Sequence, residues 1–233
     1  MIDPERATSA DALEPLVLAD WRRRVASLYA EVRTLAAADP AAAWEHWWAV
    51  RERLYREHPA SPVPAPARAS FRGKRWGYDA RYRFDVRVEP ATGAAAAAAR
   101  EVPAGIDIVA PPPAFPTSDG SAMAFGRIGW LDVPFPGGTR RLGLYWLAGY
   151  AGGLFLPFRD ETNGSATYGA GRYLLDGAKG ADLGSGRNDP GTLVLDFNFA
   201  YQPSCAFDPR WTCPLAPPEN RLDIPVEAGE RIA

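Results

Sequence analysis

Apolar residues recur at helical spacing in the first part of the chain. From residue 17 onward the intervals between them are four, four, three, four and three, which places one apolar stripe along a helix. The stripe predicts a helix over residues 11–38. Asp39-Pro40 ends this helix and starts another, with Asp39 as the N-cap and Pro40 at the first helical position. The stripe consists of Val17, Trp21, Val25, Leu28, Val32 and Leu35.

The second predicted helix runs to Glu57 and has an aromatic face. We expect this face to be covered by the domain that follows, because it is too aromatic to remain hydrated. A Pro-rich segment at 59–66 then predicts a connector. The predicted organisation is a helical segment at 1–58, the connector at 59–66 and an antiparallel β domain at 67–233. The aromatic face contains Trp44, Trp47, Trp48, Arg51, Leu54 and Tyr55.

The rest of the chain alternates between short apolar runs and turn residues. Two of these runs flank PFPGG at 134–138 and predict a β-hairpin with a loop of four to five residues. No helical pattern separates the runs, so the fold class is mainly β, either an antiparallel barrel or a two-sheet sandwich. The predicted strands are 81–88, 106–109, 122–133, 140–147, 154–158 and 167–175.

The stretch from Thr192 to Glu230 organises the domain. TLVLDFNF at 192–199 alternates and predicts a half-buried strand that carries Asp196 and Asn198 on the face opposite the core. A loop with five prolines follows. NRLDIPV at 220–226 alternates again and predicts a final edge strand.

Several strings in this chain resemble one known family. They are HPASP at 58–62, FRDETNGSATYGAGRYLLD at 158–176, LDFNFAYQPSCAF at 195–207, CPLAPPENRL at 213–222 and VEAGE at 226–230. They resemble the bacterial and archaeal family known as domain of unknown function 1684, over roughly residues 44–232. The usual form of the family has Asn in place of Gln202 and Pro in place of Ser204. The resemblance implies a fold and no reaction.

Composition and charge exclude several classes of protein. Hydrophobic residues make up 47% of the 233 residues, enough for a sizeable core. The formal net charge of −2 argues against a dedicated nucleic-acid binder. The first residues lack the pattern of a signal peptide, and no apolar run has the length of a membrane span. We therefore expect a cytoplasmic protein without membrane association, and the sequence leaves the oligomeric state open.

Cys205 and Cys213 lie in one loop, and four interpretations compete. Buried reduced thiols are favoured because cytoplasmic thiols normally stay reduced. A disulfide is the main alternative. A zinc site lacks further ligands near this loop, and a catalytic thiolate lacks a nearby histidine or helix N-terminus. We therefore expect no metal.

Other patterns bear on the chemistry without identifying it. Asp160 begins a turn, which favours a structural role for its carboxylate. Arg172 is expected to pair with Asp196 or Glu219, or else to bind an anionic ligand. YGAGRY at 168–173 lacks the strand-turn-helix context of a dinucleotide site, so no cofactor is expected.

Three functions remain open from the sequence. The first is a small-ligand-binding or accessory β domain, whose pocket is lined by polar side chains and covered by the cysteine-containing loop. The second is a hydrolase-type enzyme with acid–base chemistry at Asp196 or Tyr201. The third is a protein-interaction module that exposes the Trp-rich helix face. The candidate ligand-binding residues are Tyr168, Arg172, Asp196, Asn198, Tyr201, Cys205, Cys213, Asn220 and Arg221.

Overall fold

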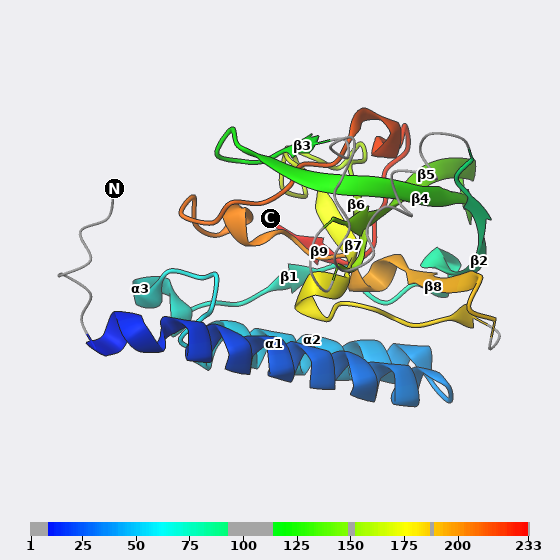
Figure 1. The fold of residues 1–233 in the computed structure, drawn as a ribbon. Helices are drawn as coiled ribbons and strands as arrows, with labels where there is room; N and C mark the ends of the chain where they lie inside the picture. Colours follow the sequence, from blue (N-terminus) through cyan, green and yellow to red (C-terminus); the bar gives the residue numbers. More distant parts are fainter. Residues whose placement is uncertain (1–8, 93–113, 149–151, 187–188, 233) are drawn as a thin grey trace.

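The computed structural model describes residues 9–92, 114–148, 152–186 and 189–232. Helices α1 (Ser9–Ala36) and α2 (Pro40–Glu57) lie side by side beneath the strands, and a short helix α3 (Ala65–Arg68) follows within the Pro-rich region (Figure 1). The predicted start of α2 is confirmed. The side chain of Asp39 accepts hydrogen bonds from the backbone N–H groups of Ala41 and Ala42, and Pro40 occupies the first turn.

Within the described residues, nine strands form two antiparallel sheets. A seven-stranded sheet has the order β7-β6-β5-β4-β2-β8, with β3 paired to β4, and a small sheet pairs β1 with β9. The predicted hairpin is β4 and β5, whose pairing continues to Phe135 and Gly138 and so leaves a shorter turn than expected. The strands are β1 (Lys74–Arg75), β2 (Arg83–Pro90), β3 (Ala114–Pro116), β4 (Ala122–Phe135), β5 (Gly138–Leu147), β6 (Leu154–Phe158), β7 (Arg172–Asp176), β8 (Thr192–Asp196) and β9 (Glu230–Arg231).

The large sheet is curled into a half-barrel. Of the two predicted architectures, this curl is closer to the antiparallel barrel than to the two-sheet sandwich. Its edge strand β7 is linked to the segment that follows β8, at the opposite edge, by hydrogen bonds in both directions between the backbones of Tyr173 and Tyr201 (2.9 and 3.0 Å). The fold is therefore mainly antiparallel β, with a curled sheet, a second small sheet and an N-terminal helical segment.

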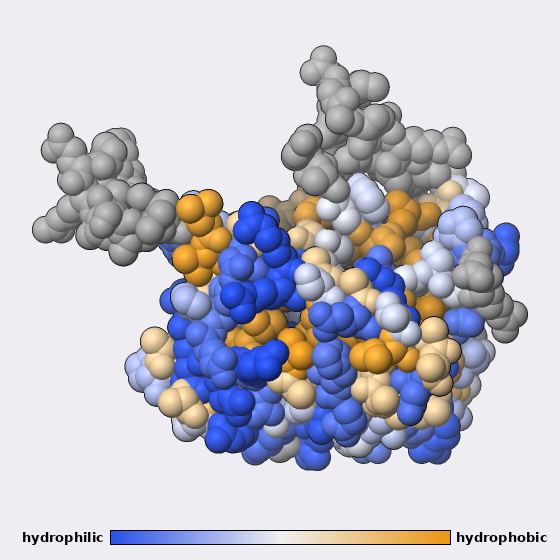
Figure 2. All heavy atoms as spheres, turned by 90° about the horizontal axis from the view of Figure 1, so that it is seen from below, coloured by the Kyte–Doolittle hydropathy of each residue, from blue (hydrophilic) through white to orange (hydrophobic). Residues whose placement is uncertain are grey.

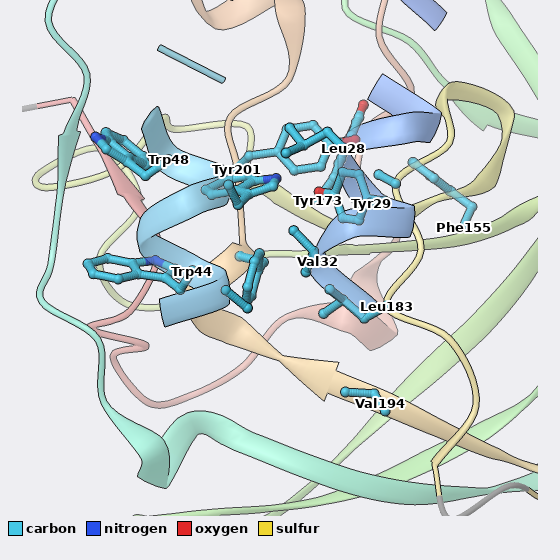
Figure 3. Close-up of a cluster of buried hydrophobic side chains, with 14 of the residues drawn as sticks. Leu28, Tyr29, Val32, Trp44, Trp48, Phe155, Tyr173, Leu183, Val194 and Tyr201 are labelled. Carbon is cyan, nitrogen blue, oxygen red and sulfur yellow. The ribbon is translucent and has the colours of Figure 1, made fainter. Parts of the chain in front are cut away.

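Two hydrophobic clusters lie on the two faces of β8. Val194 belongs to the cluster that joins α1 and α2 to the sheet, whereas Leu193 and Leu195 belong to the cluster on the other face. Figure 3 shows the first cluster, in which Leu28 and Val32 of α1 lie opposite side chains of the β domain. The whole of β8 is buried as a result.

The aromatic face of α2 forms much of this helix–sheet contact. Trp44, Trp47 and Trp48 are 3%, 1% and 7% exposed. Trp47 packs edge-to-face on Phe199 at 5.3 Å, and the indole N–H of Trp44 donates to the Asn198 carbonyl at 2.9 Å. The expectation that the β domain covers this face is confirmed. The interaction-module hypothesis is wrong in the form given, because it requires these tryptophans to be exposed. The helix side of the surface carries mostly hydrophilic residues with smaller hydrophobic areas (Figure 2).

Four predicted strands differ from the structure or lie outside it. The strand expected at 167–175 begins only at Arg172, because residues 167–171 form a bridge and turns. The strand expected at 192–199 ends at Asp196, and Phe197–Phe199 form a 3-10 turn because the Asp196 side chain accepts from the N–H of Asn198. Residues 221–229, all of which are described, form no strand. The strand expected at 106–109 lies outside the described residues.

Candidate functional site

Arg172 lies in the interior as a structural anchor. Its side chain and that of Asp160 are both fully buried, and they form an ion pair at 2.8 Å. The guanidinium also donates to the carbonyls of Val226, at 2.8 Å, and Ala228. Burial lowers the pKa of Arg172, and the charge of Asp160 opposes that effect. The guanidinium therefore attaches the C-terminal segment to β7. Its carboxylate partner is Asp160, not Asp196 or Glu219 as expected.

Asp196 and Asn198 do lie together, as predicted, but they face inward. The Asn198 amide donates to Asp196 at 2.7 Å and to the Asp79 carbonyl at 2.9 Å, and its oxygen accepts from the Asp79 N–H at 2.9 Å. Arg83 and Tyr78 donate to Asp196 at 3.4 Å each. Burial raises the pKa of Asp196, although the donors from Asn198 and the charge of Arg83 oppose the shift. This cluster fastens the segment before β2 to the end of β8.

Tyr201 belongs to another buried network, between the helices and the sheet. Its hydroxyl donates to Asp176 at 3.3 Å, and the guanidinium of Arg51 lies 4.7 Å from its ring centre. Arg51 in turn binds both carboxylate oxygens of Glu230, at 2.6 and 3.2 Å. Burial, reinforced by the charge of Asp176, raises the pKa of Tyr201 well above its ordinary value. A phenol in this state is a poor proton donor or acceptor near neutral pH.

Asn220 and Arg221 make no contact with the other candidate residues in the networks described above. The side chain of Asn220 is fully buried, and it exchanges hydrogen bonds with the backbone N–H and carbonyl of Gly143 at 2.7 and 2.9 Å. It also donates to the Pro157 carbonyl at 2.7 Å, so its side chain connects the C-terminal segment to β5 and β6 by hydrogen bonds. Arg221 is exposed beside it.

Cys205 and Cys213 lie against each other, and both are free. The backbone N–H of Cys205 donates to the sulfur of Cys213 at 3.3 Å. The hydroxyl of Tyr168 lies beside the Cys205 thiol, so these three predicted residues come together. The cysteine loop is held to the turn after β3, where Ser118 accepts from the N–H of Cys213 at 3.1 Å.

A pocket of about 260 Å³ lies beside this loop, against the small sheet. One wall is apolar and contains Phe71 and Phe207, whose rings meet edge-to-face at 5.9 Å. The backbone around Gly73 and Ala206 continues this wall. The sequence pattern does not indicate this pocket, because β1 and β9 are two residues long and carry no periodic signal. Their pairing is what places Lys74 opposite Arg231.

The polar side of the pocket carries excess positive charge. Arg72, Lys74 and Arg231 line it, and none of them forms an ion pair with a carboxylate in the described part of the chain. Glu230 also lines the pocket, but its carboxylate is already neutralised by Arg51. Gln202 is 4% exposed. Its side-chain oxygen and the Nε of Arg231 are buried without a hydrogen-bond partner among the described residues.

The described residues contain neither a membrane-spanning helix nor a metal-binding cluster. No helix there is long and apolar enough to cross a membrane. No three His, Cys, Asp or Glu side chains gather there into a group that could hold a metal ion.

Comparison with known proteins places the chain in a family. No curated protein matches it. The chain is 28% identical to an uncharacterized protein of Haloarcula marismortui whose structure was solved in solution by NMR. That similarity covers 84% of this chain and 96% of the other, with a TM-score of 0.55. Residues 70–231, which include the nine strands described above, match the model of the family described as protein of unknown function (DUF1684). The chain therefore belongs to the DUF1684 family.

Proposed function

We propose that this protein binds a small organic anion in the pocket between the small sheet and the cysteine loop. The observation that carries the proposal is the pair of unpartnered buried groups, the Gln202 oxygen and the Arg231 Nε, on residues that line the same pocket. Native proteins satisfy nearly all buried polar atoms, so unsatisfied ones on a pocket wall are typical of a site that a ligand or ordered water completes.

The charge of the pocket supports an anionic ligand. Three cationic side chains line it, and the carboxylate of Glu230 there is paired with Arg51. An arginine donor that keeps a free N–H is suited to a carboxylate oxygen, because charge-assisted hydrogen bonds are roughly twice as strong as neutral ones. The Gln202 oxygen can accept a hydrogen bond, so it suits a hydroxyl or N–H group elsewhere on the ligand.

The size and the apolar wall support a small ligand with an apolar part. The pocket volume of about 260 Å³ lies just below the range typical of small-molecule sites. Phe71 and Phe207 supply an aromatic surface in the pocket that the cations also line, so a compact carboxylate with a short aliphatic or aromatic body suits this lining.

The geometry does not favour the hydrolase alternative. That hypothesis needs Asp196 or Tyr201 to present a proton donor or acceptor to a substrate. Both side chains are buried, and their polar atoms are engaged by Asn198 and Asp176 respectively.

The binding proposal is tested with matched pairs of small acids and their neutral amides. Benzoate and benzamide, and butyrate and butyramide, are titrated into the ¹⁵N-labelled protein while amide chemical shifts are followed. We expect the acids to shift amides around Gln202 and Arg231, with the neutral amides at least tenfold weaker, which corresponds to about 1.4 kcal/mol.

Variants separate pocket binding from nonspecific attraction. Arg231→Met should weaken the binding of benzoate about tenfold, whereas Arg22→Met, at an exposed position on α1, should leave it unchanged. Equal affinity for an acid and its amide would contradict the proposal. So would shifts confined to residues outside the pocket, or no shifts at millimolar ligand.

A further inference from the structure

The two cysteines are held next to each other by backbone hydrogen bonds, and the proposed anion binding does not involve their thiols. Cys205 sits in a 3-10 turn over Ser204–Ala206, and its backbone N–H points at the sulfur of Cys213, 3.3 Å away. Cys213 is fixed from the other side, because Ser118 bonds both its N–H, at 3.1 Å, and its carbonyl, at 2.9 Å. The side chains of the two cysteines are therefore neighbours, in a loop that Ser118 holds in place.

The surroundings of the two sulfurs differ. The Cys205 thiol is surrounded by Cys213, Tyr168 and Ser118. The neighbouring Cys213 is the main cause that lowers the pKa of Cys205 to about 6, and the same pairing raises the pKa of Cys213 well above its ordinary value. Cys205 is therefore the more acidic thiol of the pair and the one that more readily forms the nucleophilic thiolate.

Access to the pair is narrow. Cys205 is 9% exposed and Cys213 is 2% exposed, so the thiolate is the member nearer to solvent. A reagent the size of hydrogen peroxide can reach such a sulfur with small local movement, whereas a tripeptide disulfide needs the loop to open.

We propose that Cys205 and Cys213 form a peroxide-reactive dithiol, in which Cys205 attacks and Cys213 resolves. The Cys205 thiolate attacks one peroxide oxygen, breaks the O–O bond and releases hydroxide, which leaves a sulfenic acid on Cys205. Cys213 then attacks the sulfur of Cys205. The S–O bond breaks, water leaves, and a Cys205–Cys213 disulfide forms. Overall, two thiols and one hydrogen peroxide give one disulfide and two waters.

The first test follows the products by mass. Reduced wild-type protein is treated with hydrogen peroxide. Remaining free thiols are then alkylated with N-ethylmaleimide, and the mass of the intact protein is measured by mass spectrometry. We expect wild type to lose the mass of two hydrogen atoms and both alkylation sites. Cys213→Ser should instead stop at a sulfenic acid that dimedone traps, and Cys205→Ser should react at least tenfold more slowly. Equal rates for wild type and Cys205→Ser would overturn the assignment, as would faster oxidation of wild type by glutathione disulfide than by peroxide.

The second test begins with wild type, so its main result does not depend on the folding of a variant. The rate of alkylation by iodoacetamide is measured against pH, with the site identified by peptide mapping. We expect the midpoint for Cys205 near pH 6. Circular dichroism first confirms that Cys213→Ala and Tyr168→Phe are folded. In both, the midpoint should move toward the ordinary thiol value of about 8.5. Tyr82→Phe, whose ring packs with the other hydrophobic cluster, is the matched control. A wild-type midpoint near 8.5 would overturn the proposal.

Discussion

Arg172→Met tests whether a buried guanidinium holds the C-terminal segment in place. Methionine keeps an unbranched side chain in the interior but removes the charge and the donors. The substitution leaves the Asp160 carboxylate without its cation and frees the carbonyls of Val226 and Ala228. Removing one partner of a buried ion pair costs about 3–5 kcal/mol. The freed carbonyls make the upper part of that range the expected value.

Urea denaturation followed by tryptophan fluorescence measures this loss, because eight tryptophans report on the fold. For a chain of this size the same loss lowers the melting temperature by roughly 6–20 °C. The matched control is Arg81→Met, which breaks the Arg81–Asp79 pair at a side chain that is 75% exposed. We expect that control to change stability by less than about 1 kcal/mol.

A double variant separates the unpaired charge from the lost donors. In Asp160→Asn/Arg172→Met no carboxylate remains unpaired at this site. The oxygen of the introduced amide can still accept from the Thr162 N–H, as the Asp160 carboxylate does at 2.7 Å. We therefore expect the double variant to be more stable than Arg172→Met alone. Equal losses for Arg172→Met and Arg81→Met would refute the reasoning.

Two further predictions concern the backbone and acid stability. Gly229 has φ of +80°, and a Cβ there would lie 2.4 Å from the Ala200 carbonyl oxygen, so Gly229→Ala should cost more than about 1 kcal/mol in urea denaturation. Gly77→Ala meets no atom within 4 Å and should be neutral or slightly stabilising; equal effects would contradict the steric argument. Hydrogen bonds from Thr117, Thr212 and Ser121 hold the pKa of Asp119 well below its ordinary value. Its stabilisation is therefore complete above the unfolded value of about 3.9 and is lost as the pH falls toward the folded value. The difference in melting temperature between wild type and Asp119→Asn should narrow between about pH 5 and pH 2, and a constant difference would contradict this.

The helices could be predicted from the sequence because their signals are local. The spacing of Trp21, Leu28 and Val32 reflects one buried stripe, and Asp39-Pro40 is a start signal that needs no tertiary contact. Strands could also be predicted from the sequence where an apolar run pairs with the next run along the chain, as in the β4–β5 hairpin. The curl of the sheet was not predictable, because it depends on the link between Tyr173 and Tyr201, which belong to segments far apart in the sequence.

The alternation of apolar and polar residues predicted strands incorrectly where side chains are buried for a reason other than strand pairing. Leu222 and Val226 are 3% and 0% exposed, as a strand pattern implies, yet the segment is irregular. It is held by isolated backbone hydrogen bonds to Arg159 and Glu161. At 192–199 the two faces of β8 are both buried, so the polar Asp196 and Asn198 turn inward to bind backbone and not outward to a ligand.

The candidate site was predictable in part. Tyr168 lies near Cys205 and Cys213, but the expected cluster does not form as a whole, because Arg172, Asp196 and Tyr201 belong to separate buried networks. The partner of Arg172 and the pocket around Arg231 were not predictable. Each depends on contacts between segments that the sequence pattern does not pair.

The ion pair between Arg51 and Glu230 has a consequence for how the chain is made. Synthesis proceeds from the N-terminus, so Arg51 is made 179 residues before its partner Glu230, and the tryptophans of α2 are made earlier still. Until then the aromatic face of α2 has no sheet to cover it, and exposed apolar surface of this kind promotes aggregation. The nascent chain therefore depends on late completion of its sheet, and slow translation of the last strands would lengthen the period in which chaperones must shield the helices.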